Sequence, residues 1–410
     1  MSVLLAAGDP LFSKGVDLAV ILIVVLKCVL TFTIALVSVM LMVWFERRVI
    51  AFMANRVGPN RAGPAGLFQT VADGIKLFFK EPIHPDKADR GIYGIAPYLV
   101  LVPALVSFSV IPFSVRPVHV FGHDTYLQLA DPPIGILLVL AMSSIAVYGV
   151  MLAGWASGSK YPLLGGVRAS AQMVSYEAAL GLSVAAVVLY TGSLYTSDIV
   201  LNQAMGAGVL HFLPNWNLVR LGVVPFVIFT IAALAEIERP PFDLLEAESE
   251  LVAGFNTEYS SIGFALFYLA SYLNLVTMSG IIVTLFLGGP AGPRIIGPAW
   301  LWGLVWFFAK LMLFLFGAVW IRGTLPRFRY DQLMDLGWKR LLPLSLGWLL
   351  LVASLLATEG DGAGRRTVVV GTIVVLGIVV YLALLRAIAV GRHVGDLDDS
   401  IRPTRARKAA

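Results

Sequence analysis

The sequence predicts an all-α polytopic membrane protein with about nine tilted transmembrane helices. Of the 410 residues, 58% are hydrophobic and only 13% are charged, whereas water-soluble domains usually carry about 25% charged residues. The apolar residues gather in runs long enough to cross a bilayer, which takes roughly 20 residues. Because lipid offers no partner to backbone polar groups, each run should be helical. The runs lie at 16–45, 95–114, 134–157, 174–192, 218–237, 261–287, 298–321, 341–357 and 367–390.

The 30 lysines and arginines predict the orientation of these spans. With the N-terminus outside, 21 of them fall in the inside segments, six in the outside segments and three within spans. Basic residues favour the cytoplasmic side, so we expect an outside N-terminus and a cytoplasmic C-terminus. No repeat or linker divides the chain, which indicates one bundle over 1–390 and a basic cytoplasmic tail at 391–410. The predicted inside segments are 46–94, 158–173, 238–260 and 322–340.

The chain offers little that could hold a redox cofactor. Cys28 is its only cysteine, which excludes an iron–sulfur cluster with cysteine ligands and an internal disulfide. His119 and His123 are the only close histidines and lack further ligands. The net charge of +5 comes from bases at loop positions, which are topology signals and do not indicate nucleic-acid binding. We expect no flavin, iron–sulfur cluster or metal in this chain, no nucleic-acid partner, and no redox activity of the chain alone.

The long inside segment 46–94 contains a predicted amphipathic helix. Its apolar side chains recur every three or four residues, at Phe68, Val71, Ile75, Phe78 and Phe79. Polar residues occupy the other face, as in helices that lie at a membrane interface or beneath a soluble partner. Periodicity alone fits a peripheral helix without chemistry equally well.

The most unusual inside segment is acidic. Seven acids and one base, Arg239, lie between Glu236 and Glu258. If the stretch after Pro241 is helical, Glu246 and Glu250 share a face one turn apart. Partly buried carboxylates that close resist joint ionisation, so some should stay protonated near neutral pH and could load and release protons. The alternative is a solvated acidic loop, which the interleaved apolar residues disfavour.

Three further charges lie inside predicted spans. Glu177 occurs early in the fourth span, and an ionisable group there is costly and indicates function. Lys310 lies midway along the seventh span, where we expect a buried pairing role. Lys27, in the first span, could reach the interface or pair with Asp17.

Several motifs in one order connect these segments to a known family. They are Phe45-Glu46-Arg47-Arg48, Arg56-Val57-Gly58-Pro59-Asn60-Arg61-Ala62-Gly63-Pro64, Ala72-Asp73-Gly74-Ile75-Lys76, Gly166-Val167-Arg168, Ser175-Tyr176-Glu177, the acidic segment, and Pro326-Arg327-Phe328-Arg329-Tyr330-Asp331-Gln332. From Phe45 to about Lys339, the chain resembles the H subunit of bacterial respiratory complex I, the proton-translocating NADH:quinone oxidoreductase, and its mitochondrially encoded counterpart.

The resemblance implies a function that composition does not show. In this family the subunit forms the membrane side of a quinone chamber, soluble iron–sulfur subunits close the chamber, and quinone reduction is coupled to proton movement into the membrane arm. The acids that match the family's proton path are Glu177, Glu236, Glu246, Glu248 and Glu250. The residues that match positions around the quinone passage are Asp73, Arg239 and Glu258. The implied substrate is a quinone, the implied partners are the other complex I subunits and lipid, and the implied location is the bacterial plasma membrane.

The chain departs from the family pattern at three places. Glu238 stands where the pattern has a small polar residue, and Ser271 stands where it commonly has an acid. One link of the proton path is therefore expected to differ here. The run 367–390 and the basic tail extend beyond the eight spans of the mitochondrial form.

Three other functions are compatible with an apolar bundle that carries buried charge. The nearest is the homologous membrane subunit of a membrane-bound hydrogenase. A secondary transporter should show two repeated halves with broken helices, and no such symmetry occurs. A purely structural anchor leaves Glu177 and Lys310 without a role.

Overall fold

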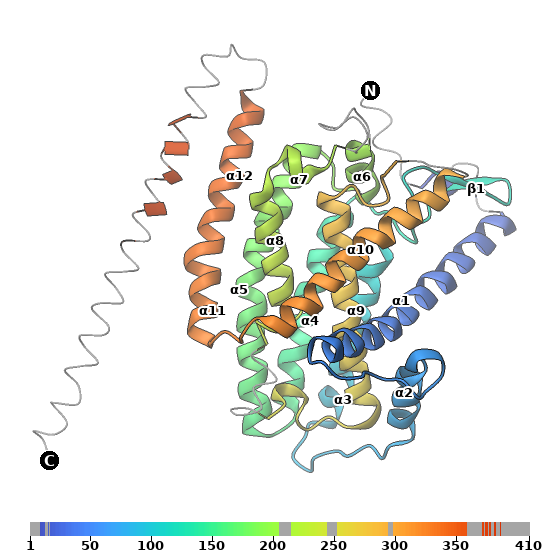
Figure 1. Cartoon of the computed structure of the whole chain (residues 1–410), viewed down its shortest axis with the longest axis vertical. Helices are drawn as coiled ribbons and strands as arrows, with labels where there is room; N and C mark the ends of the chain where they lie inside the picture. Colours follow the sequence, from blue (N-terminus) through green and yellow to red (C-terminus); the bar gives the residue numbers. More distant parts are fainter. Residues whose placement is uncertain are drawn as a thin grey trace, which may run out of the picture.

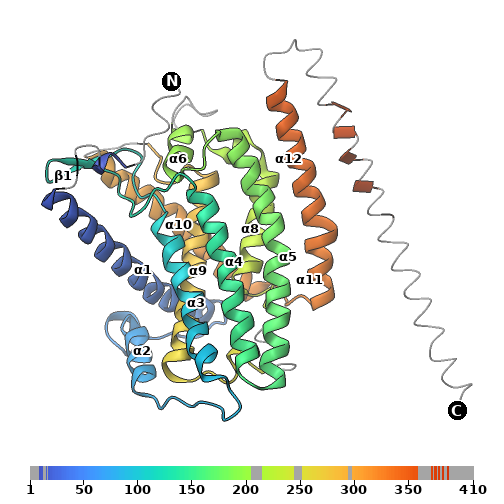
Figure 2. The same ribbon diagram turned by 180° about the vertical axis from the view of Figure 1, so that it is seen from behind.

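The computed structural model describes residues 9–12, 15, 17–204, 215–243, 252–293 and 298–358, and short pieces between 371 and 386. This part of the chain is an all-α bundle with one small β-hairpin (Figures 1 and 2). Its elements are α1 (Leu18–Met53), α2 (Gln69–Phe79), α3 (Arg90–Ser109), β1 (Val118–Val120), β2 (His123–Thr125), α4 (Gly135–Ala156), α5 (Lys160–Thr191), α6 (Thr196–Ala204), α7 (Asn217–Arg220), α8 (Val223–Glu236), α9 (Ser261–Phe286), α10 (Ala299–Thr324), α11 (Tyr330–Leu336) and α12 (Leu342–Ala357), with short 3₁₀ or π-helical turns η1 (Pro10–Phe12), η2 (Pro64–Gly66), η3 (Gly254–Asn256) and η4 (Gly337–Leu341).

The predicted fold class is confirmed. Seven of the described helices are long and apolar enough to span a membrane, and the shorter apolar helix α8 corresponds to the fifth predicted run. Helices α11 and α12 are joined by the π-helical turn η4 into one span, Tyr330–Ala357. The ninth predicted run, 367–390, lies almost entirely outside the described residues. The chain is a multi-pass membrane protein.

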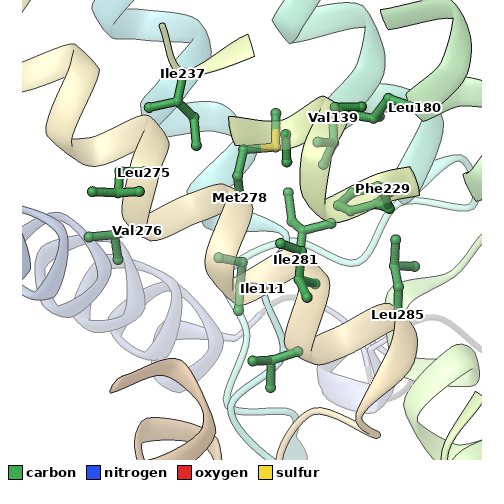
Figure 3. Packing of buried hydrophobic residues seen from close by; sticks show 14 of the residues in the cluster. Ile111, Val139, Leu180, Phe229, Ile237, Leu275, Val276, Met278, Ile281 and Leu285 are labelled. Carbon is green, nitrogen blue, oxygen red and sulfur yellow. The ribbon is translucent and has the colours of Figure 1, made fainter. Parts of the chain in front are cut away.

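Helix α9 lies at the centre of the bundle. In its most apolar stretch 83% of the residues are buried, against 17% in α1 and 28% in α10, whose exposed apolar side chains are suited to lipid. Figure 3 shows Ile281 and Leu285 of α9 packed near Phe229 of α8 and Ile111, which follows α3. Helices α1 and α10 cross the outside of this core at a steep tilt (Figure 1).

Two helices extend well beyond the apolar runs that predicted them. Helix α1 continues to Met53, eight residues past its run, and α5 begins at Lys160, fourteen residues before its run. Charged residues end a hydrophobic run without ending a helix, because lysine, arginine and glutamate have good helix propensity. Most of the predicted inside loop 158–173 is thus the first part of α5.

The two ends of the bundle differ in structure. One end, here called the α2 end, carries α2, the chain on either side of it and the segments 237–243 and 252–260; the other, the hairpin end, carries β1, β2, α6 and α7 (Figures 1 and 2). Helix α2 confirms the predicted amphipathic helix. Its apolar side chains are unpacked, with Phe78 exposed by 67% and Phe79 by 88%.

The two lysines noted within spans find partners towards the hairpin end. Lys27 forms an ion pair with Asp9 at 2.7 Å, so the suggested pairing with Asp17 is wrong. Lys310 is buried and donates to the backbone carbonyls of Leu287, Gly289 and Ala291 at 2.7, 2.9 and 2.7 Å. These carbonyls follow the end of α9, where helix carbonyls lack intrahelical partners and attract positive charge.

Candidate functional site

A buried carboxylate with two guanidinium partners lies at the α2 end. Glu46, on α1, is only 4% exposed. Arg239, which follows α8, donates to both of its oxygens at 3.3 and 3.2 Å, and Arg322 of α10 contacts Oε1. The Arg239 guanidinium also lies 3.9 Å from the ring centre of Tyr272 on α9, a cation–π contact. This cluster ties four parts of the fold together and leaves one net positive charge.

Glu46, Arg322 and Tyr272 of this cluster line a cleft of about 610 Å³. Other wall residues come from the end of α1, the loop after it, α2 and α9: Arg47, Arg56, Gly58, Gln69 and Tyr268. Asp73 of α2 lies beside the cleft, where it pairs with Arg47 at 2.6 Å and accepts from Gln69 at 3.1 Å. The cleft therefore combines positive charge with tyrosine rings.

A second carboxylate is buried at the end of α8. Glu236 is 2% exposed; its Oε1 accepts a short hydrogen bond from Ser143 of α4, and its Oε2 has no partner among the described residues. It lines a cavity of about 60 Å³ together with Ser107, Ser271 and Asn274. This cavity has room for a few water molecules and the polar groups to hold them.

Glu236 and Glu177 each bond to one of two consecutive serines of α4. Glu177, on α5, accepts a short hydrogen bond from Ser144, the neighbour of Ser143 on α4. A hydroxyl can donate one hydrogen bond and accept others, so Ser143 and Ser144 can pass protons as well as position the acids. The turn after α8 is fixed by Gln172, whose amide donates to the carbonyls of Ala235 and Phe242, both at 2.7 Å.

A third cavity, of about 100 Å³, lies between the cleft and the Glu236 cavity. It shares Tyr268, Tyr272 and Arg322 with the cleft, and Glu238 and Ser271 with the Glu236 cavity. Burial raises the pKa of Glu238 well above the usual value of a glutamic acid, and the nearby charge of Asp243 raises it further. We call this space the middle cavity.

The structure brings together some of the residues that the sequence singled out. Arg239 lines the middle cavity, Glu236 lines the cavity next to it, and Asp73 lies beside the cleft. Glu177 bonds to Ser144, the neighbour of the serine that bonds to Glu236. Glu258 lines neither the cleft nor the two cavities; its backbone carbonyl accepts from Tyr93. The remaining predicted acids, Glu246, Glu248 and Glu250, lie outside the described residues.

Sequence reasoning assigned no role to four residues of this site: Glu46, Ser143, Ser144 and Arg322. Glu46 and Arg322 adjoin the ends of apolar runs, where charge usually marks the membrane interface. A serine pair in a span is common because its hydroxyls can bond to the helix's own carbonyls. The one feature of the sequence that could have pointed to the serines is that they are adjacent. Their acidic partners lie far away in the chain, 33 residues from Ser144 and 93 residues from Ser143.

Comparison with known proteins identifies the family. The profile of the NADH dehydrogenase family matches residues 26–353. A protein of Frankia alni is 47% identical over 383 residues, which cover 92% of this chain and 82% of the relative. One from Cutibacterium acnes is 44% identical over 389 residues, which cover 92% of this chain and 87% of the relative. Both are named as the H subunit of NADH-quinone oxidoreductase. The chain belongs to this family of H subunits.

Membership in the family establishes which complex the chain belongs to. The chain is a membrane subunit of a multi-subunit NADH-quinone oxidoreductase, the complex expected from the sequence motifs. The relatives' names favour this complex over the hydrogenase alternative. Among the residues that the structure describes, no group of histidine, cysteine, aspartate and glutamate could hold a metal ion.

Proposed function

We propose that this protein forms the membrane side of a quinone chamber and carries a carboxylate path that couples quinone reduction to proton translocation. The observation that supports this most directly is a pair of polar contacts within the apolar bundle: buried Glu236 bonds to Ser143, and half-buried Glu177 bonds to the next residue, Ser144. Buried polar groups without a role are costly in a membrane. Two acids that each bond to one of two adjacent hydroxyls have the form of part of a proton path.

The cleft is suited to a quinone. Its volume of about 610 Å³ lies within the range of small-molecule sites. The carbonyl oxygens of a quinone accept hydrogen bonds, and Arg322 and Tyr272 supply donors in the wall of the cleft, while the hydroxyl of Tyr268 donates to that of Tyr272. Ile50 and Val57 offer apolar surface to the ring or tail. Asp73, beside the cleft, and Arg239, bound to Glu46 of its wall, are proposed to border the passage, as the family resemblance implies. Glu258 is proposed there from the resemblance alone, since it lines neither the cleft nor the two cavities.

Reduction of a quinone takes up protons as well as electrons. A quinone becomes a quinol by taking two electrons and two protons, and a partner subunit must deliver the electrons because we expect no redox cofactor in this chain. The negative charge that develops on the quinone attracts protons through a low-dielectric site, where such forces are strong. Glu177 and Glu236 can hold or release a proton at their carboxyl oxygens, and we assign Glu246, Glu248 and Glu250 to the same path.

The proposed function requires one orientation in the membrane. The α2 end faces the cytoplasm, since predicted inside segments rich in lysine and arginine lie there. The N-terminus then lies outside and the C-terminus inside the bacterial plasma membrane. Soluble iron–sulfur subunits are proposed to cover the α2 end, and membrane-arm subunits to continue the proton path.

Substitution of Glu236 tests this function. Glu236→Gln keeps the shape and can still bond to Ser143, but it cannot release a proton. In the assembled complex we expect quinone-linked NADH oxidation and proton pumping to fall by about 100-fold, the lower range of a general acid–base contribution. NADH oxidation with an artificial acceptor should persist. The control is Asp124→Asn, which changes an acid of the hairpin that is 64% exposed and should leave pumping unchanged. Pumping at the wild-type rate in Glu236→Gln would contradict the proposal.

A further inference from the structure

The Glu236 cavity and the cleft do not meet directly. They share no wall residue, and the middle cavity lies between them. A proton path from the cleft to Glu236 therefore has to cross the wall between the middle cavity and the Glu236 cavity. That wall consists of five side chains: Ile237, Glu238, Phe255, Phe267 and Ser271.

Glu238 is the one acid in this shared wall. Its Oε1 is inaccessible and has no hydrogen-bond partner among the described residues. A buried carboxylate oxygen without a partner is destabilising, so Glu238 does not serve stability here. The middle cavity also places Asp243, Arg239, Arg322, Tyr268 and Tyr272 around it, and the second cavity places Glu236 there.

The backbone at Glu238 is unusual as well. Its φ is +58°, in the left-handed region that residues other than glycine rarely adopt. Such conformations persist where the surrounding structure holds them and cluster at functional sites. The clamp of Gln172 on the carbonyls of Ala235 and Phe242, either side of Glu238, provides that hold.

We propose that Glu238 is the proton-transfer residue that joins the cleft to Glu236. This proposal rests on the proposed function. A proton arrives from the cleft through water of the middle cavity and binds the carboxylate of Glu238. The same carboxyl then gives a proton through water of the second cavity to Oε2 of Glu236. Each transfer breaks one O–H bond and forms another, and no electron moves.

Ser271, a member of the same shared wall, supports this assignment. It lines the same two cavities as Glu238, and it stands where the family pattern commonly has an acid. The shared wall thus carries a carboxylate from the turn after α8 and a hydroxyl from α9. If the path requires a carboxylate in this wall, whichever element supplies it, the two positions should be exchangeable.

This exchangeability gives a sharp experiment in the assembled complex. Glu238→Gln should lower quinone-linked proton pumping by about tenfold or more, with artificial-acceptor activity retained. Ser271→Glu in the same variant should restore most of the pumping, which a merely structural role of Glu238 would not allow. Wild-type pumping in Glu238→Gln, or failure of Ser271→Glu to restore it, would overturn the proposal.

Two further measurements separate the possible failures. If Glu236→Gln is impaired while Glu238→Gln pumps normally, the inference on Glu238 fails and the proposed function stands. If both variants pump normally, the proposed function fails.

Should Glu238→Gln not assemble, the wild-type complex can be treated with dicyclohexylcarbodiimide, which modifies protonated carboxyls in apolar surroundings. An adduct at Glu238 by mass spectrometry is expected, and its absence would overturn the proposal.

Discussion

Replacement of Glu46 by glutamine tests the cluster that holds the cleft together. The change leaves the guanidiniums of Arg239 and Arg322 without their common counter-charge, and their side chains are only 12% and 28% exposed. Removing one partner of a buried ion pair costs about 3–5 kcal/mol, largely because the other charge stays buried and unpaired. We take about 3 kcal/mol, since glutamine can still accept one hydrogen bond and Arg322 is partly hydrated.

A loss of this size should be visible in the lifetime of the complex. About 3 kcal/mol corresponds to a more than 100-fold shift in an equilibrium, and part of it will appear in the rate of unfolding. We expect the half-life of quinone-linked NADH oxidation at a fixed elevated temperature to shorten at least tenfold. Asp331→Asn removes the partner of Arg329 in a pair that is 80% and 66% exposed, and such pairs contribute about 0–1 kcal/mol. If Glu46→Gln and Asp331→Asn inactivate at the same rate, the cluster does not hold the cleft.

Three other substitutions test separate contacts. A Cβ at Gly165 would lie 2.7 Å from the Cα of Gly254, so Gly165→Ala should displace the wall of the middle cavity and lower the stability of the complex by about 1–3 kcal/mol. Gly181 has open space around it, so Gly181→Ala should leave the stability unchanged. Equal melting temperatures of the two variants would refute this prediction. Lys310→Met leaves three carbonyls without their donor and should lower the stability of the fold by about 3 kcal/mol. The measurement is the melting temperature of the complex, which should fall. A melting temperature equal to that of the wild type would show that water replaces the ammonium group. Because the pKa of Glu238 is raised from 4.5, its charged form destabilises the fold as pH rises above that value. Glu238→Gln should therefore gain thermal stability relative to wild type from pH 5 to pH 9, and a constant difference would contradict the burial of that carboxyl.

The sequence predicted the spans well because the bilayer imposes one length and one composition on each. Helix α8 shows the limit of this reasoning. The run 218–237 contains both α7 and α8, since Gly222 adopts a φ of +84° and turns the chain between them. Hydropathy is insensitive to such a turn, because the residues on both sides are apolar.

The site was only partly predictable from the sequence. The costly charges, Glu236 and Glu177, were identifiable because an acid in an apolar run needs a reason. The contacts of these acids could not be predicted from the sequence, because nothing near Ser143 and Ser144 in the chain indicates that the fold places an acid against each of them. The significance of Glu238 likewise depends on cavities enclosed by residues distant in sequence, including Phe267 and Ser271 of α9.

The proposed function depends above all on quinone binding in the cleft at the α2 end. A second cleft of nearly equal size, about 590 Å³, lies at the hairpin end and is lined by Arg116, His119 and Trp300 among others, which provides an internal comparison. The native complex can be illuminated with a photoreactive quinone analogue, with and without excess unlabelled quinone, and the adducts located by mass spectrometry. We expect competed adducts in peptides that contain residues 46–59 or 268–272. Competed adducts near Arg116 or Trp300, with none at the α2 end, would contradict a quinone chamber at that end.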